Sequence, residues 1–202
     1  MKYETLNIRL LVPILATISL LLQSCDETFA PKPRGYFRIQ LPKREYTRFS
    51  PPECPFSFES SSAASVFSDS SRTSEPCWYN IEYNRYKATV YLSYKPVRGD
   101  LARMTEDCRS LAMKHVAKAS GIEEHEYADR TNGVYGLSYD LKGNSASPIQ
   151  FWVTDSTKNF LRGSLYFYAV PNSDSVAPIL DFIREDLRHL MESVRWSNRS
   201  DS

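Results

Sequence analysis

The sequence lacks the short motifs that mark the common enzyme classes. Among its 202 residues there is no Gly-x-Ser-x-Gly elbow to expose a nucleophilic serine, and no glycine-rich loop to cradle a phosphate. It has only three histidines, His115, His125 and His189, and none has a second histidine at the spacing of a zinc site. We therefore expect no enzymatic activity, no cofactor and no metal.

The chain also lacks an excess of charge of either sign. Residues 1–24 hold Lys2, Glu4 and Arg9, so the rest of the chain carries 23 basic and 23 acidic residues. No block of five or six like charges occurs, whereas a nucleic-acid-binding protein shows a basic stretch. Nucleic acid is therefore not an expected partner.

The apolar run at the start of the chain is too short to span a membrane. It extends from Leu10 to Leu22, after a segment that holds Lys2 and Arg9, and is typical of an export signal. A membrane-spanning helix needs about 20 apolar residues. The run ends at Leu22-Gln23-Ser24-Cys25, which resembles a lipobox. We expect cleavage before Cys25 and its lipidation; an ordinary secretory signal before a coincidental cysteine is the alternative.

Three cysteines remain after Cys25, and three cannot all pair within one chain. Exported proteins reach oxidising compartments, in which disulfides persist. Cys54 and Cys77 flank a serine-rich stretch and lie beside expected strands, so we expect a disulfide between them, which would contribute about 3 kcal/mol. Cys108 falls on the apolar face of an expected helix and is interpreted as a buried free thiol.

The composition divides the chain into three parts. Residues 1–24 are expected to form a lipoprotein signal peptide, residues 25–50 a lipidated N-terminus with a proline-rich tether, and residues 51–198 a single α+β domain. Nine serines between residues 57 and 75 indicate an exposed loop.

Hydrophobic periodicity predicts strands and two long amphipathic helices in the domain. The patterns place a hairpin that turns near Asn84, a helix that Gly121 ends, four further strands and a last helix. The expected strands span 78–83, 88–94, 123–129, 134–141, 149–154 and 160–170, and the helices 101–119 and 176–194. We expect an α+β fold in which both helices pack on the apolar face of one antiparallel sheet. The element order resembles the Mog1/PsbP-like α/β/α sandwich.

Three features are candidates for a site, and each has a structural alternative. The acidic run around His125, residues 123–126, could hold a divalent ion weakly, but a solvated strand edge is the better interpretation. The polar run 154–159 is either a site or a capped hairpin loop. Aromatic residues at 151, 152, 160 and 166–168 form either a partner surface or packing beneath the last helix.

Nine short segments follow one another along most of the chain: PKPRGYFRI (31–39), CPFSF (54–58), CWYNI (77–81), LSYK (92–95), KH (114–115), QF (150–151), TDS (154–156), NFLRG (159–163) and LYF (165–167). Together they resemble one family, the gliding-motility lipoprotein GldD of Bacteroidetes. The resemblance implies a role in gliding and type IX secretion, and it brings no catalytic residues. Residues 155–157 and 174–176 also resemble the pattern of Asp, then Ser or Thr, then an apolar residue, which Bacteroidetes use for periplasmic O-glycosylation. The resemblance makes Ser156 and Ser175 possible acceptors.

These inferences predict a lipid-anchored envelope protein that faces the periplasm. Its expected partners are the membrane, through the anchor, and other envelope proteins of the gliding and secretion machinery. A periplasmic module that binds glycan or peptide on the same anchor is the alternative. The sequence leaves open which membrane holds the anchor.

Overall fold

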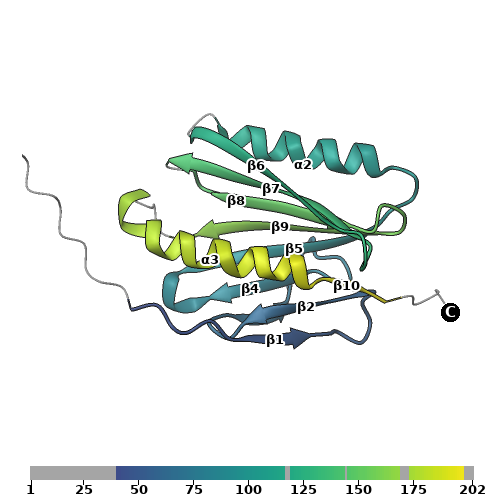
Figure 1. Cartoon of the computed structure of the whole chain (residues 1–202), viewed down its shortest axis with the longest axis horizontal. Coiled ribbons are helices and arrows are strands. Elements are labelled where there is room, and N and C mark those ends of the chain that lie inside the picture. The colour runs from purple at the N-terminus through teal and green to yellow at the C-terminus, as the bar shows by residue number, and fades with distance from the viewer. Residues whose placement is uncertain (1–39, 117–118, 144, 169–172, 198–202) are drawn as a thin grey trace, which may run out of the picture. The chain divides into compact units, whose positions relative to one another are not determined.

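The computed structural model describes residues 40–116, 119–143, 145–168 and 173–197, and their strands form two antiparallel sheets (Figure 1). The large sheet has the strand order β3-β4-β5-β9-β8-β7-β6, and the small sheet the order β1-β2-β10. The strands are β1 (Tyr46–Phe49), β2 (Phe56–Ser61), β3 (Ser65–Ser68), β4 (Tyr79–Tyr83), β5 (Ala88–Pro96), β6 (Ala119–Asp129), β7 (Val134–Gly143), β8 (Ile149–Thr154), β9 (Asn159–Phe167) and β10 (Arg195–Trp196). The α-helices of the described ranges are α2 (Leu101–Val116) and α3 (Ser173–Ser193).

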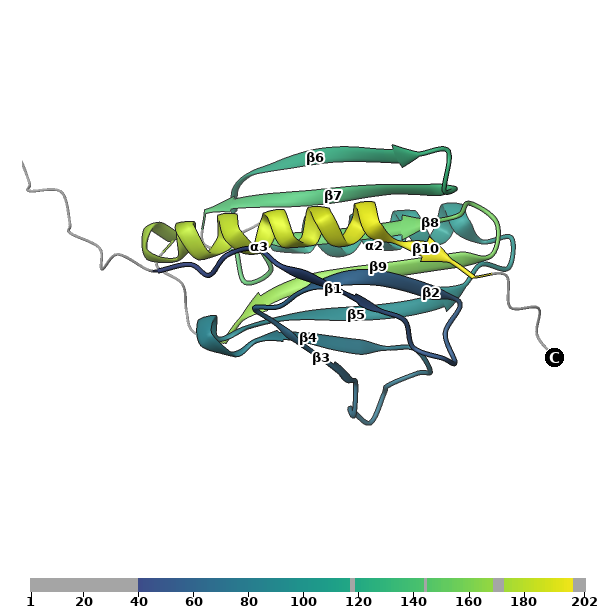
Figure 2. The ribbon, with the colours of Figure 1, turned by 60° about the horizontal axis from the view of Figure 1, so that its bottom comes forward.

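The two helices cover opposite faces of the large sheet (Figures 1 and 2). Because side chains alternate along β8, Phe151 joins the core beneath α3 and Trp152 packs toward α2. The small sheet lies on the α3 side, where Phe56 and Phe58 of β2 join the same core. The predicted α+β class is confirmed, but the helices do not share one apolar face.

The central strands and the last helix follow the predicted patterns. β4 and β5 form the expected hairpin around Asn84, which begins a short 3-10 helix. β9 then pairs with β5 along its whole length, so α2 and β6–β8 form an excursion between two neighbouring strands. The apolar stripe of α3, including Ile183, Leu187 and Leu190, is buried in the main core.

The structure differs from the predicted elements most clearly in four places. The serine-rich stretch contains β2 and β3, because Phe58 is buried in β2 and Val66 pairs with Ile81 of β4. Helix α2 ends at Val116, and Gly121 lies inside β6 rather than after a helix. β9 ends at Phe167. β1 lies within the segment assigned to the tether, so the folded part begins before residue 51.

A disulfide joins Cys54, which precedes β2, to Cys77, which precedes β4. This is the pairing predicted from the sequence. Cys54 is buried in the main core, and Cys77 adopts a left-handed backbone conformation with φ 65°. The bridge therefore ties the small sheet to strand β4 of the large sheet.

Candidate functional site

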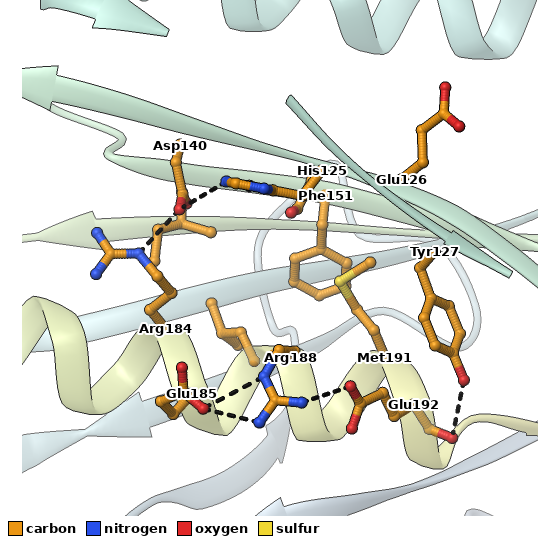
Figure 3. A pocket seen from close by; sticks show the side chains of 13 residues that line it. His125, Glu126, Tyr127, Asp140, Phe151, Arg184, Glu185, Arg188, Met191 and Glu192 are labelled. Carbon is orange, nitrogen blue, oxygen red and sulfur yellow. Dashed lines mark hydrogen bonds and ion pairs between the residues drawn. The ribbon is translucent and has the colours of Figure 1, made fainter. Parts of the chain in front are cut away.

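A groove lies between α3 and strands β6–β8 (Figure 3). Its volume is about 340 Å³. The apolar part of its lining comes from Ile149 and Phe151 of β8 and from Leu187 and Met191 of α3. The groove can therefore accommodate an apolar group.

The groove exists because β7 carries small or short side chains toward α3. Alternation along β7 puts Gly136, Ser138 and Asp140 on the face that α3 covers. A Cβ atom at Gly136 would lie 2.6 Å from the backbone oxygen of Trp152 and 2.8 Å from Cγ1 of Val153. Close packing thus requires glycine at this position, and the groove lies beside it, over Ser138 and Asp140.

Phe151 is held in the groove wall by a glycine on the neighbouring strand. Phe151 pairs with Gly163 of β9, and its ring lies directly over that residue. A Cβ atom at position 163 would lie 2.3 Å from both Cε1 and Cζ of the ring. The ring of Phe151 therefore occupies the space that a side chain at position 163 would fill.

One end of the groove is closed by a paired carboxylate. Asp140 of β7 is buried, and its Oδ2 accepts a hydrogen bond of 2.9 Å from Nε of Arg184. The same oxygen lies 3.6 Å from Nε2 of His125 on β6. Arg184 also forms an ion pair with Asp181. These contacts join α3 to the two outermost strands across the groove.

A second ionic network lines the α3 side of the groove. Arg188 forms ion pairs with Glu185 at 2.8 Å and with Glu192 at 2.6 Å, one turn to either side of it on the helix. Tyr127 of β6 donates a hydrogen bond of 3.5 Å from its hydroxyl to the backbone oxygen of Glu192 (Figure 3). One arginine against two glutamates leaves a net charge of −1 in this network, so the groove offers apolar surface with an acidic rim.

A buried carboxylate anchors the start of the folded chain to α3. The side chain of Asp186 accepts hydrogen bonds from the hydroxyls of Tyr46 at 3.0 Å and Tyr83 at 3.2 Å. Burial raises the pKa of Asp186, although hydrogen bonds, including those from Ser61 and the two tyrosines, lower it in part. Burial and the nearby Asp186 charge raise the pKa of Tyr46 to about 12. This cluster serves the packing of β1.

His189 lies in the same contact region between β1 and α3 as Asp186, rather than in a metal site. Its ring stacks on Tyr46 with centroids 3.7 Å apart, and its Nε2 lies 2.7 Å from a carboxylate oxygen of Glu59. The hydrogen bond from His189 lowers the pKa of Glu59. The pair therefore links β2, β1 and α3, and gives His189 a structural partner.

The polar run 154–159 is a capped hairpin loop between β8 and β9. Asp155 Oδ1 accepts backbone hydrogen bonds from Thr157, Lys158 and Asn159 at 2.9, 2.7 and 2.9 Å. Burial raises the pKa of Asp155, but these hydrogen bonds outweigh it and leave the pKa below 3.8. Ser156 is exposed at this turn with φ 68°. The carboxylate is used to hold the turn.

The other predicted site residues lie apart from the groove or outside the described chain. Cys108 is a buried free thiol on α2, and burial raises its pKa to about 11. Burial and the charge of Arg162 lower the pKa of His115 at the end of α2. Cys25 and the side chain of Ser175 lie outside the described residues.

No group of three or more His, Cys, Asp or Glu side chains that could hold a metal ion occurs among the described residues. Within the same ranges, no helix is both long enough and apolar enough to cross a membrane.

The ion pairs that line the groove and the buried Asp186 were not predicted from the sequence. Asp140 and Arg184 are 44 positions apart, and nothing local relates them. Asp186 gave a usable signal, because it lies three residues after Ile183 and four before Leu190, within the apolar stripe of α3. A carboxylate in such a stripe must find buried partners.

Comparison with known proteins gives a family and a structural likeness. A model of the family described as gliding motility lipoprotein GldD matches residues 26–196. No curated protein matches the chain. Among solved structures, the solution structure of cyanobacterial PsbP (CyanoP) from Synechocystis sp. PCC 6803 is similar, with 8% identity and a TM-score of 0.48. The similarity covers 75% of this chain and 92% of the other.

Proposed function

The chain belongs to the gliding motility lipoprotein GldD family, and from this premise we propose that it is a non-catalytic component of the gliding and type IX secretion machinery. In this proposal the lipid on Cys25 holds the folded part at a membrane of the cell envelope, on the periplasmic side. The chain then acts by contact with other envelope proteins.

The observation that carries the proposal is the position of the family match. It begins at residue 26, immediately after the lipobox cysteine, and continues to residue 196. A lipidated Cys25 would therefore be followed directly by the family sequence. Several lipid chains on one residue give stable anchoring, because each buried methylene contributes about 0.8 kcal/mol.

The structural contacts of the charged residues in and near the groove also support a non-catalytic role. In the groove, Asp140 pairs with Arg184, and Arg188 pairs with two glutamates. Asp155 and Asp186 hold a turn and a strand. A catalytic base needs a partner or a substrate within its reach, whereas these side chains are engaged in the fold.

A periplasmic module that binds glycan or peptide is the second candidate function. The observation that favours it is a pair of exposed tyrosines on two neighbouring interior strands of the large sheet. Tyr91 on β5 is 41% exposed, and Tyr168, directly after β9, is 68% exposed. The hydroxyl of Tyr168 lies 2.9 Å from Oγ1 of Thr89. Saturable binding of a defined saccharide or peptide to the purified chain, lost in Tyr91→Ala, would favour this candidate.

Affinity purification from membranes solubilised in mild detergent tests the first proposal. The tagged wild type is compared with Cys25→Ala, and Cys108→Ala serves as the matched control for loss of a cysteine. We expect gliding or secretion proteins to co-purify with the wild type and with Cys108→Ala, and to be lost from Cys25→Ala. A chain that purifies alone in all three strains would contradict the proposal.

A further inference from the structure

The long outer strand β6 is open to pairing along one side. It spans Ala119–Asp129 and is the longest strand of the described chain, yet within that chain it pairs only with β7 (Figures 1 and 2). An edge strand presents a row of unpaired backbone N–H and C=O groups, and folded proteins usually keep such edges short. An edge of this length offers hydrogen bonds to an added strand.

The two faces of β6 differ in chemistry. The register with β7 puts His125 and Tyr127 on the α3 side, where both line the groove. It puts Glu124 and Glu126 on the α2 side, two residues apart and both exposed. Neither glutamate forms a salt bridge with a described residue, whereas Glu123 pairs with Lys142 at 3.0 Å.

We propose that β6 binds an extended basic segment of a partner protein as an additional strand of the large sheet. Alternate side chains of that segment are lysine or arginine and face Glu124 and Glu126 across the new strand pair. The intervening side chains are apolar and pack against Tyr127 at the groove. This inference rests on the proposed function, in which the chain works by contact with other proteins, and it names the surface and the chemistry of the contact.

The charges select this partner over a second copy of the chain. Two β6 strands paired with each other would bring glutamates of one copy beside glutamates of the other. Like charges directly opposite one another destabilise a strand pair, while opposite charges stabilise it. An acidic edge is therefore protected against self-association and stays available to a basic strand.

A peptide of defined sequence tests the inference without knowledge of the natural partner. The probe is an acetylated, amidated nine-residue peptide that alternates lysine with valine or leucine, and a scrambled peptide of the same composition is its control. The protein is the mature chain from residue 25 with Cys25→Ala. Binding is followed by titration, and amide hydrogen exchange measured by NMR reports where the peptide lies.

We expect the alternating peptide to bind and to slow exchange at alternate amides of β6. The double variant Glu124→Lys, Glu126→Lys should weaken binding about tenfold or more, and should instead bind the peptide in which glutamate replaces lysine. The control Glu53→Lys, Glu82→Lys makes the same change in net charge away from β6 and should leave the affinity unchanged.

Four outcomes would overturn the inference. They are no binding of the alternating peptide, equal binding of the scrambled peptide, protection outside β6, and protection of β6 that rises with protein concentration in the absence of peptide, which would mean self-association. The co-purification experiment is independent of these results. Loss of partners from Cys25→Ala together with failed peptide binding would retain the proposed function and reject this surface.

Discussion

The contact between Gly163 and Phe151 makes a quantitative test of the groove. In Gly163→Ala the new Cβ would lie 2.3 Å from two ring atoms of Phe151, and ordinary contact begins near 3.4 Å. The ring must therefore move by about 1.1 Å within the main core, where it is 1% exposed. Overpacking of this kind costs about 2–3 kcal/mol, because the side of the ring away from the groove packs against buried core residues.

Unfolding of the mature Cys25→Ala chain, followed by circular dichroism in urea and on heating, measures this cost. We expect the melting temperature of Gly163→Ala to fall by about 4–10 °C. Gly121→Ala is the matched control, since Gly121 also lies in a strand and a Cβ there meets nothing within 4 Å. Its stability should change by less than about 0.5 kcal/mol.

A double-mutant cycle separates the ring contact from general effects of the substitution. Phe151→Leu removes the two ring atoms that collide with the new Cβ, and by itself it should destabilise the chain by about 1–2 kcal/mol. Combined with Gly163→Ala, it should cost at least about 1 kcal/mol less than the sum of the single changes. Additive costs, or a Gly163→Ala variant as stable as the control, would refute the reasoning.

Three further predictions concern other parts of the fold. The pKa of Glu59 lies below 4.5 because His189 donates a hydrogen bond to its carboxylate. The contribution of this pair to stability is therefore present above pH 4.5 and is lost as the pH falls through the lowered pKa. Glu59→Gln should make the free energy of unfolding, measured in urea, less dependent on pH on the acid side. Replacing Cys54 and Cys77 together by alanine should lower the free energy of unfolding by about 3 kcal/mol, and an unchanged urea midpoint would contradict the bridge's role. Cys108 should resist iodoacetamide in the native chain and react after unfolding, as mass spectrometry would show, because it is buried with a pKa of about 11.

Local periodicity was enough to predict the central strands and the stripe of α3. The alternation of Val90 and Leu92 places β5, and the spacing of Ile183, Leu187 and Leu190 places the buried side of α3. The serine-rich stretch was misread because serine is more typical of loops than of strands. There β2 is stabilised because Phe56 and Phe58 are buried against α3, which lies more than 100 residues further along the chain.

The candidate site depended on contacts that no local pattern encodes. The groove arises where the short side chain of Ser138 on β7 faces α3, and its end is closed by the pairing of Asp140 with Arg184. The acidic run at His125 was correctly interpreted as a solvated strand edge. That the same strand is the longest of the described chain, and borders a groove, follows only from the assembled sheet.

Complementation of a deletion strain tests most directly whether the chain is an anchored part of the secretion and gliding machinery. Secreted proteins in the culture medium are compared after expression of the wild type, Cys25→Ala or Cys108→Ala, with equal amounts of folded chain verified in each strain. We predict that deletion abolishes secretion, that the wild type and Cys108→Ala restore it, and that Cys25→Ala does not. Normal secretion in the deletion strain, or full rescue by Cys25→Ala, would contradict the account.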